Sequence, residues 1–171
     1  MSAYTIFDPF VDKPLHELKR DDALKAFEWF MSQREIRLHE LQSLLKDDSI
    51  ELDFTEDSLN ELDNWFVQKV RAEGPSGEPS SFVFSICNDI GIYVSETMIR
   101  ARPKLHWHFY TANRKDIAYQ RPVIMGFSVS NKNYNIDCDY LLCQYAFRLL
   151  KGGENEDNML TSIYEYGVNH T

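Results

Sequence analysis

The stretch SFVFSICNDIGIYVSETMIRAR, residues 81–102, decides the fold. Ser80 or Ser81 suits the N-cap of a helix, and Pro103 disfavours helical backbone just before it, which predicts a helix between them. Apolar residues occupy most of the circumference of this helix instead of a single stripe, which is typical of a helix contacted from several sides. We therefore expect a central buried helix with the remaining elements packed around it.

A polar seam interrupts this helix at steps of four, three and four residues, and consists of Asp89, Tyr93, Glu96 and Arg100. This spacing places all four on one side of a helix. A functional interpretation makes Glu96 a general acid or base and Asp89 the second carboxylate of a hydrolytic pair, although roughly 10 Å of helix axis separates them. The favoured interpretation is structural: Glu96 pairs with Arg34 or Arg100 and fixes how two helices dock.

Two further helices are predicted before the central one. The first spans residues 21–46, where one apolar stripe is interrupted only at Arg34; the stripe consists of Leu24, Phe27, Met31, Leu38, Leu41 and Leu45. The second begins after Thr55, a good N-cap residue, and ends near Gly74, a good C-cap residue.

After the central helix the apolar period changes from that of a helix to that of a strand. LHWHFY, residues 105–110, and RPVIMGFSV, residues 121–129, alternate apolar and polar positions, and IAY between them offers a possible third strand. Asp137 then caps a helix that ends at the Gly152–Gly153 pair, and residues 155–168 form a last short helix. We predict an α+β fold: a mainly helical single domain, residues 1–171, with a two- to three-stranded antiparallel sheet inserted between helices three and four.

The charge distribution points to a basic protein as the partner. The formal net charge of −9 argues against nucleic acid, which requires clustered Lys and Arg. Residues 47–68 contain eight acidic residues and neither Lys nor Arg, and such a surface attracts basic partners. The alternative is a solvated face that only aids solubility. The predicted interaction residues are Asp53, Glu56, Asp57, Glu61 and Asp63.

The cysteines and the chain start favour a reducing, cytoplasmic setting. Three cysteines without a C-x-x-C pair suggest neither a disulfide framework nor a zinc site. The first residues lack a basic region followed by an apolar one, and no apolar run approaches the roughly 18 residues that a membrane span needs. We therefore expect no membrane contact.

Two histidines offer a weak metal-binding pattern. His106 and His108 lie on the same face of the first predicted strand, opposite Trp107, which we expect in the core. They bind a metal only if a third ligand such as Asp116, Glu96 or His16 arrives in space. The sequence places no third ligand at a characteristic spacing, so we predict surface histidines, no metal and no cofactor.

The order of motifs resembles that of small, functionally unassigned bacterial proteins. IGIYVSETMIR contains G-x-Y-x-x-E, Trp107 follows, and PVIMGF matches P-V-x-x-G-F. FEWFMSQREIRLHEL, residues 27–41, is similar to a further part of the same pattern. Ser95 stands where Gly is common in that group. The resemblance covers about residues 21–150 and implies a fold more than an activity.

Three functions follow as hypotheses, and the absence of G-x-S-x-G, H-E-x-x-H and phosphate-loop motifs favours a protein that is not an enzyme. The first is an acidic interaction module, most concretely an immunity or antitoxin-like inhibitor of a basic partner. The second is a small hydrolase or metal-dependent enzyme, which requires Glu96, Asp89 and the two histidines to converge on a pocket. The third is a small-molecule sensor with a pocket at Tyr93, Glu96 and Arg100.

Overall fold

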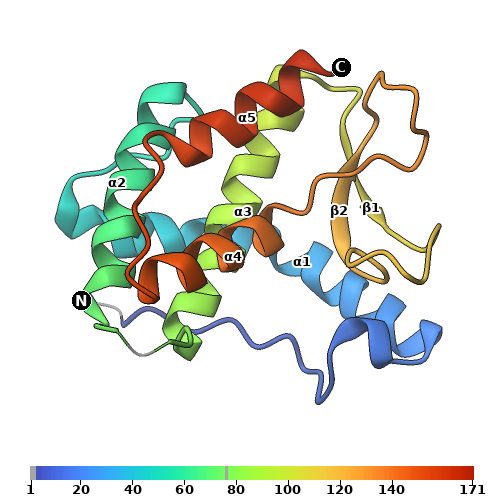
Figure 1. The fold of residues 1–171 in the computed structure, drawn as a ribbon, viewed down its shortest axis with the longest axis horizontal. Coiled ribbons are helices and arrows are strands. Elements are labelled where there is room, and N and C mark those ends of the chain that lie inside the picture. The colour runs from blue at the N-terminus through green and yellow to red at the C-terminus, as the bar shows by residue number, and fades with distance from the viewer. Residues whose placement is uncertain (1–2, 76) are drawn as a thin grey trace.

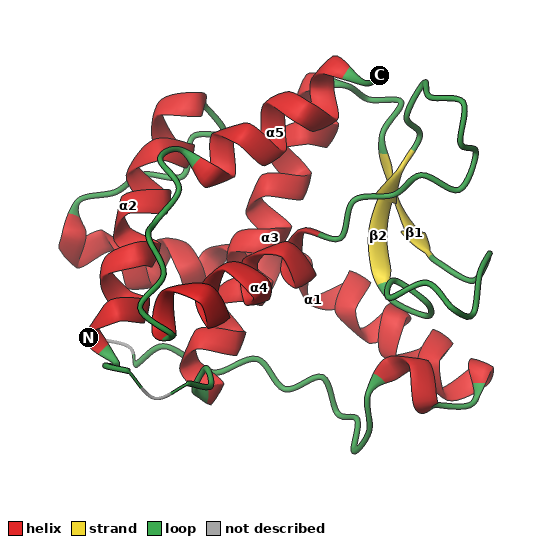
Figure 2. Cartoon of the chain, in the orientation of Figure 1, coloured by secondary structure: helices red, strands yellow, loops and turns green. Residues whose placement is uncertain are grey.

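The computed structural model describes residues 3–75 and 77–171, and within them the fold is mainly helical (Figures 1 and 2). The α-helices are α1 (Arg20–Leu45), α2 (Glu56–Ala72), α3 (Ser81–Ala101), α4 (Cys138–Leu150) and α5 (Met159–Asn169). Two short 3-10 helices, η1 (Leu15–Glu17) and η2 (Lys46–Asp48), flank α1. Strands β1 (His106–Phe109) and β2 (Pro122–Met125) pair antiparallel between α3 and α4. The predicted α+β fold with a small sheet between helices three and four is confirmed.

The central position of α3 is also confirmed. Figure 1 shows α3 running through the middle of the molecule, between α1, α4 and α5. Ser80 begins the helix by accepting a hydrogen bond from the backbone N–H of Val83 at 3.2 Å. Fourteen of its 21 residues are buried, which is what an apolar helix contacted from several sides requires.

By length and composition α3 is long and apolar enough to cross a membrane, which corrects the expectation that no segment is. However, 78% of its most apolar window is buried against the rest of the fold. Such burial is that of a core helix in a soluble protein, because a spanning helix presents its apolar surface to lipid.

The buried side of α1 differs from the stripe that the sequence predicts. Leu24 is 38% exposed, whereas Ala23, Phe30, Arg37 and Leu41 are buried. The first part of the helix is turned so that Phe30 contacts Trp107 of β1, with ring centroids 5.1 Å apart. The two-stranded sheet therefore orients α1 through aromatic contacts that helical periodicity alone does not reveal.

A close approach between α3 and α4 depends on Gly91. A Cβ atom at Gly91 would lie 3.0 Å from the backbone N of Asp139 and 3.2 Å from its Cα. These are backbone atoms at the start of α4, so they cannot rotate away as a side chain does. A side chain at position 91 would therefore push α3 and α4 apart.

The N-terminal strap, which we define as residues 4–19, runs along one edge of the molecule before α1 begins (Figure 1). At one end Tyr4 packs edge-on against Phe82, with ring centroids 5.6 Å apart. At the other end the side-chain amide of Gln120 donates to the carbonyls of Leu15 and Leu18 at 2.6 and 3.0 Å. The strap is mostly extended chain that is tied to the helices at both ends.

Candidate functional site

The most buried charged group of the molecule is the ion pair between Arg37 of α1 and Asp89 of α3. Arg37 donates from Nε and Nη2 to the two oxygens of Asp89 at 2.8 and 2.7 Å. Their side chains are 4% and 0% exposed. Arg37 also donates to the carbonyl of Thr5 at 2.7 Å and to Tyr4 Oη at 2.9 Å. This pair therefore ties together α1, α3 and the N-terminal strap.

The surroundings of Asp89 are those of a structural group. Burial raises the pKa of Asp89, while hydrogen bonds from Arg37 and Tyr4 oppose the rise. Asn88 donates a further hydrogen bond at 3.1 Å. A carboxylate with both oxygens engaged and no exposed surface has no route to a substrate.

Glu96 lies in a second, separate polar cluster. The structure brings together Glu96 and Arg34, the pair that the sequence predicts, through a hydrogen-bonded ion pair with side chains 19% and 28% exposed. Trp107 Nε1 donates to the same Glu96 oxygen at 2.8 Å. Trp107 is thus half-buried and hydrogen-bonded, which refines its expected place in the core.

Tyr93 and Arg100 complete the predicted polar seam but have other partners. Tyr93 is fully buried, and its hydroxyl accepts the backbone N–H of Phe54 at 2.7 Å and lies 2.6 Å from Ser58 Oγ. Arg100 is exposed, and its guanidinium carbon lies 3.8 Å from the centre of the Phe54 ring. The polar seam is therefore three unconnected contacts of α3, two of which dock α1 and one the start of α2.

His106 and His108 are both exposed on β1, with ring centroids 6.2 Å apart. Burial and the neighbouring His106 lower the pKa of His108. Within residues 3–75 and 77–171, no three His, Cys, Asp or Glu side chains are grouped as metal ligands are. Glu96, Asp89 and the histidines occupy separate places, so the arrangement that the hydrolase hypothesis requires is not present.

The two buried cysteine side chains, Cys87 and Cys138, are unsuited to nucleophilic chemistry. Burial raises the pKa of Cys138 to about 12 and raises that of Cys87 as well. A thiol that stays protonated at neutral pH is a poor nucleophile. Cys143 is half-buried, and its thiol donates to Asp139 Oδ1 at 3.7 Å.

The acidic surface, which we define by its exposed carboxylates, extends from the end of α1 across the connection to the second turn of α2. Its members are Asp47, Glu51, Asp53, Glu56, Asp57 and Glu61. None of these six forms an ion pair in the part of the chain that the structure describes. Asp48 lies beside them but is paired with Lys69 at 3.6 Å and accepts from Trp65 Nε1 at 2.8 Å.

Local structure fixes the start of α2 within this surface. Thr55 caps the helix by accepting from the backbone N–H of Ser58 at 3.2 Å, as the sequence predicts. Asp53 accepts from both the hydroxyl and the backbone N–H of Thr55, and the hydroxyl bond lowers the pKa of Asp53. The start of α2 therefore has a defined backbone, and Asp53 stays ionised at neutral pH.

Asp63 does not belong to the acidic surface, which corrects its place among the predicted interaction residues. It is 3% exposed and accepts from the backbone N–H of Met159 at 3.1 Å through Oδ2, while Oδ1 is buried and has no hydrogen-bond partner among residues 3–75 and 77–171. Burial raises its pKa to about 6, against the Met159 hydrogen bond, and Asp157 and Glu156 add to the rise. Asp63 joins α2 to the start of α5 and faces no solvent.

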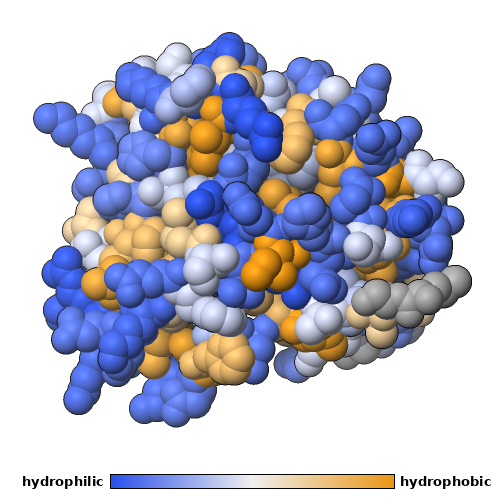
Figure 3. Space-filling view, turned by 180° about the vertical axis from the view of Figure 1, so that it is seen from behind, coloured by the Kyte–Doolittle hydropathy of each residue, from blue (hydrophilic) through white to orange (hydrophobic). Residues whose placement is uncertain are grey.

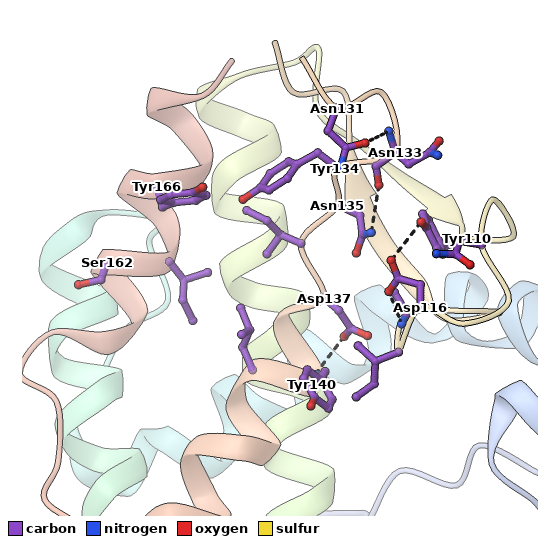
Figure 4. A pocket seen from close by; sticks show the side chains of 16 residues that line it. Tyr110, Asp116, Asn131, Asn133, Tyr134, Asn135, Asp137, Tyr140, Ser162 and Tyr166 are labelled. Carbon is purple, nitrogen blue, oxygen red and sulfur yellow. Dashed lines mark hydrogen bonds between the residues drawn. The ribbon is translucent and has the colours of Figure 1, made fainter. Parts of the chain in front are cut away.

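A shallow groove of about 790 Å³ lies between α5, the start of α4 and the loops around the sheet (Figure 4). Figure 4 shows Tyr166 and Ser162 on one side and the asparagine-rich segment 131–135 on the other. Several of its polar groups bond to one another; Asp116, for example, accepts from Tyr110 Oη at 3.2 Å and from the backbone N–H of Ala118 at 2.9 Å. None of Tyr93, Glu96 and Arg100 lines this groove.

Arg121 forms a charged cluster that the sequence analysis missed. Its guanidinium bonds Asp137, the N-cap of α4, and donates to Asp139 Oδ2 at 2.9 Å. Asp137 faces the groove of Figure 4, whereas Asp139 lies on the opposite side of the α4 start. One guanidinium thus holds two carboxylates, and the cluster carries a net negative charge.

The surface opposite the view of Figure 1 has hydrophobic residues in small groups separated by hydrophilic ones (Figure 3). Scattered groups of this kind are ordinary for a soluble protein surface. The hydrophobic residues of this face therefore do not indicate a binding surface in place of the acidic surface.

No known protein family, curated protein or solved structure matches this chain. The resemblance to small bacterial α+β proteins accordingly stays a prediction, and function has to be argued from the geometry of this molecule.

Proposed function

We propose that the protein is a cytoplasmic, non-enzymatic interaction protein whose acidic surface binds a basic protein partner. An inhibitor of the immunity or antitoxin type is the most concrete form of this proposal. The observation that carries it is the run of six exposed carboxylates, from Asp47 to Glu61, which form no ion pair with any described residue. Unpaired exposed carboxylates are available to a partner's Lys and Arg, and they speed the encounter with it.

The alternatives receive less support from the same geometry. A hydrolase needs Glu96, Asp89 and the histidines around one substrate, but Asp89 is fully buried in its ion pair. A sensor that uses Tyr93 needs the hydroxyl free, but backbone and Ser58 already engage it. An interaction surface needs only exposure and complementary charge, and both are available from residue 47 to residue 61.

The test begins by capturing partners from a lysate of the source organism at low salt and purifying the captured protein. Binding of the two purified proteins is then measured for the wild type and for Glu51→Gln, Glu56→Gln and Glu61→Gln combined. The matched control combines Glu28→Gln, Glu35→Gln and Glu165→Gln, which remove three charges from exposed positions of α1 and α5. Circular dichroism verifies that both triple variants are folded.

We expect the acidic-surface variant to bind about tenfold more weakly, mainly through slower association, and the control to bind as the wild type does. Affinity of the wild type should fall steeply as salt rises, because exposed charges are screened. A partner that binds both triple variants equally, or whose affinity is indifferent to salt, would contradict the proposal. So would an empty capture at low salt.

A further inference from the structure

The strap cavity is a partly open space of about 670 Å³ beneath the N-terminal strap, separate from the acidic surface. It lies between the strap, α1, the N-terminal half of α3, the sheet and the start of α4. Apolar side chains form most of its walls: Phe7, Phe27, Phe30, Phe84, Ile92 and Trp107. A volume of roughly 300–1,000 Å³ with mainly apolar walls is typical of small-molecule sites.

The polar groups of the strap cavity gather at the start of α4. Asp139 is 35% exposed although its neighbour Asp137 is 6% exposed, and Asp139 lines the cavity. Its Oδ2 accepts from Arg121, but the partner of Oδ1 within the described chain is the thiol of Cys143 at 3.7 Å. A thiol is a weak donor, so Oδ1 keeps most of its capacity to accept a hydrogen bond.

The charged residues around the strap cavity determine which kind of ligand can bind there. Asp8, Lys13, Arg121 and Asp139 are the charged residues that line the described cavity, and Asp137 stands behind Arg121. Two carboxylates and two cations line the cavity, but Arg121 also pairs with Asp137 behind it, so the cluster of Arg121, Asp137 and Asp139 has one more carboxylate than cations. A ligand carboxylate would meet this excess of negative charge, whereas an ammonium group would neutralise it.

The pKa of Asp139 also favours a ligand with an ammonium group. Burial raises its pKa, Arg121 opposes the rise and Asp137 adds to it. A half-buried carboxylate with a raised pKa is short of compensating positive charge, and a ligand ammonium group would supply that charge. The remainder of the ligand would fill the aromatic walls and gain from the removal of apolar surface from water.

We propose that the strap cavity binds a small hydrophobic amine, with the ammonium group donating to Asp139 and the apolar body packed between the strap and α3. Arg121 holds Asp139 in place, and Asn88 lines the same cavity as a further polar group. The chain from Pro9 to Pro14 covers the site between the two tied ends of the strap.

Three probes with the same apolar body test the preference: phenylbutylamine, phenylbutanol and phenylbutanoic acid, each titrated calorimetrically into the whole protein. We expect the amine to bind about tenfold more tightly than the alcohol, the effect of one charge-assisted hydrogen bond, and the acid to bind most weakly. Asp139→Asn should bring the amine to the affinity of the alcohol. Asp116→Asn, in the groove of Figure 4, is the matched control and should keep the wild-type preference.

A measurement on the unaltered protein locates the site even if Asp139→Asn fails to fold. Cys143 lines the strap cavity, and the other two cysteines are buried, so the amine should slow alkylation of Cys143 by iodoacetamide. Tighter binding of the acid, an unchanged preference in Asp139→Asn, or no binding of any probe at about 1 mM would overturn the proposal. Amine binding that leaves the alkylation rate of Cys143 unchanged would overturn it too.

Discussion

Replacing Arg37 by methionine removes the cation from the fully enclosed Arg37–Asp89 pair while keeping an unbranched apolar stem. Asp89 then retains hydrogen bonds from Tyr4 and Asn88 but loses both bonds from the guanidinium. The carbonyl of Thr5 loses its donor as well. The variant therefore has a buried anion without a cation, and its N-terminal strap is loosened.

The size of the effect follows from the exposure of the pair. Because the side chains are 4% and 0% exposed, solvent cannot replace Arg37, and breaking such a pair costs about 3–5 kcal/mol. Domains of this size are stable by about 5–15 kcal/mol, so the variant loses a large share of its free energy of unfolding. Burial already raises the pKa of Asp89, and loss of Arg37 raises it further. Protonation then relieves part of the loss, so the cost should be smaller at about pH 5 than at pH 8.

Urea unfolding measures this free energy, and an unchanged slope indicates that the native state keeps its compactness. The informative comparison is with the double variant that combines Arg37→Met and Asp89→Leu, in which neither charge remains. Tyr4 Oη and Ser85 Oγ, 2.8 Å apart, can still bond each other there. Replacing both members of a buried pair by apolar residues is often neutral, so the double variant should be more stable than Arg37→Met alone.

A loss below about 1 kcal/mol in Arg37→Met would refute the reasoning, since that is the range of exposed pairs. A double variant that is less stable than Arg37→Met would also refute it, because Asp89 would then stabilise the fold without its cation.

Three further predictions concern other contacts. Burial raises the pKa of Asp63 in the folded protein to about 6, above its unfolded value, so its contribution to stability is fully present below about pH 4 and is lost, by about 3 kcal/mol, as the pH rises through 6. Urea unfolding of Asp63→Asn should therefore depend less on pH than that of the wild type. An unchanged pH profile would count against the raised pKa of Asp63. Glu96→Ala breaks the half-buried pair with Arg34 and should destabilise by about 1–3 kcal/mol in thermal unfolding; equal or higher stability would instead fit a functional Glu96. Gly91→Ala forces its Cβ against the backbone of Asp139 and should lower the free energy of unfolding by about 1–3 kcal/mol. Urea unfolding measures this loss, and an unchanged stability would contradict the prediction.

The fold was predictable where local chemistry and periodicity agree. Thr55, Ser80 and Asp137 each cap the helix that the sequence assigns to them. The circumferential apolar pattern of residues 81–102 identifies the central helix because few other environments accept such a surface. The alternation around Trp107 likewise locates β1.

The polar contacts were predictable only in part. Arg34 was found because it interrupts an apolar stripe, whereas Arg37 lies outside that stripe and looks like a surface residue. Its burial is set by the turn of α1 against the sheet and by the strap, neither of which has a periodic signal. Asp63 similarly looks like part of an acidic run, although α5 covers it.

The strap cavity gave no sequence signal at all. Its walls come from six separate segments of the chain, and Asp139 and Arg121 meet through a loop whose course periodicity does not predict. Residues 121–139 contain two carboxylates and two cations, an ordinary composition that marks no site. Only the packing of α4 on α3 through Gly91 brings these groups to one place.

Hydrogen exchange on the complex with the purified basic partner tests the proposed function most directly. The account predicts that the partner slows amide exchange from residue 47 to residue 61, and that this protection weakens in the Glu51→Gln, Glu56→Gln, Glu61→Gln variant. Protection confined to the strap or to the groove between α4 and α5, with residues 47–61 exchanging as in the free protein, would contradict it.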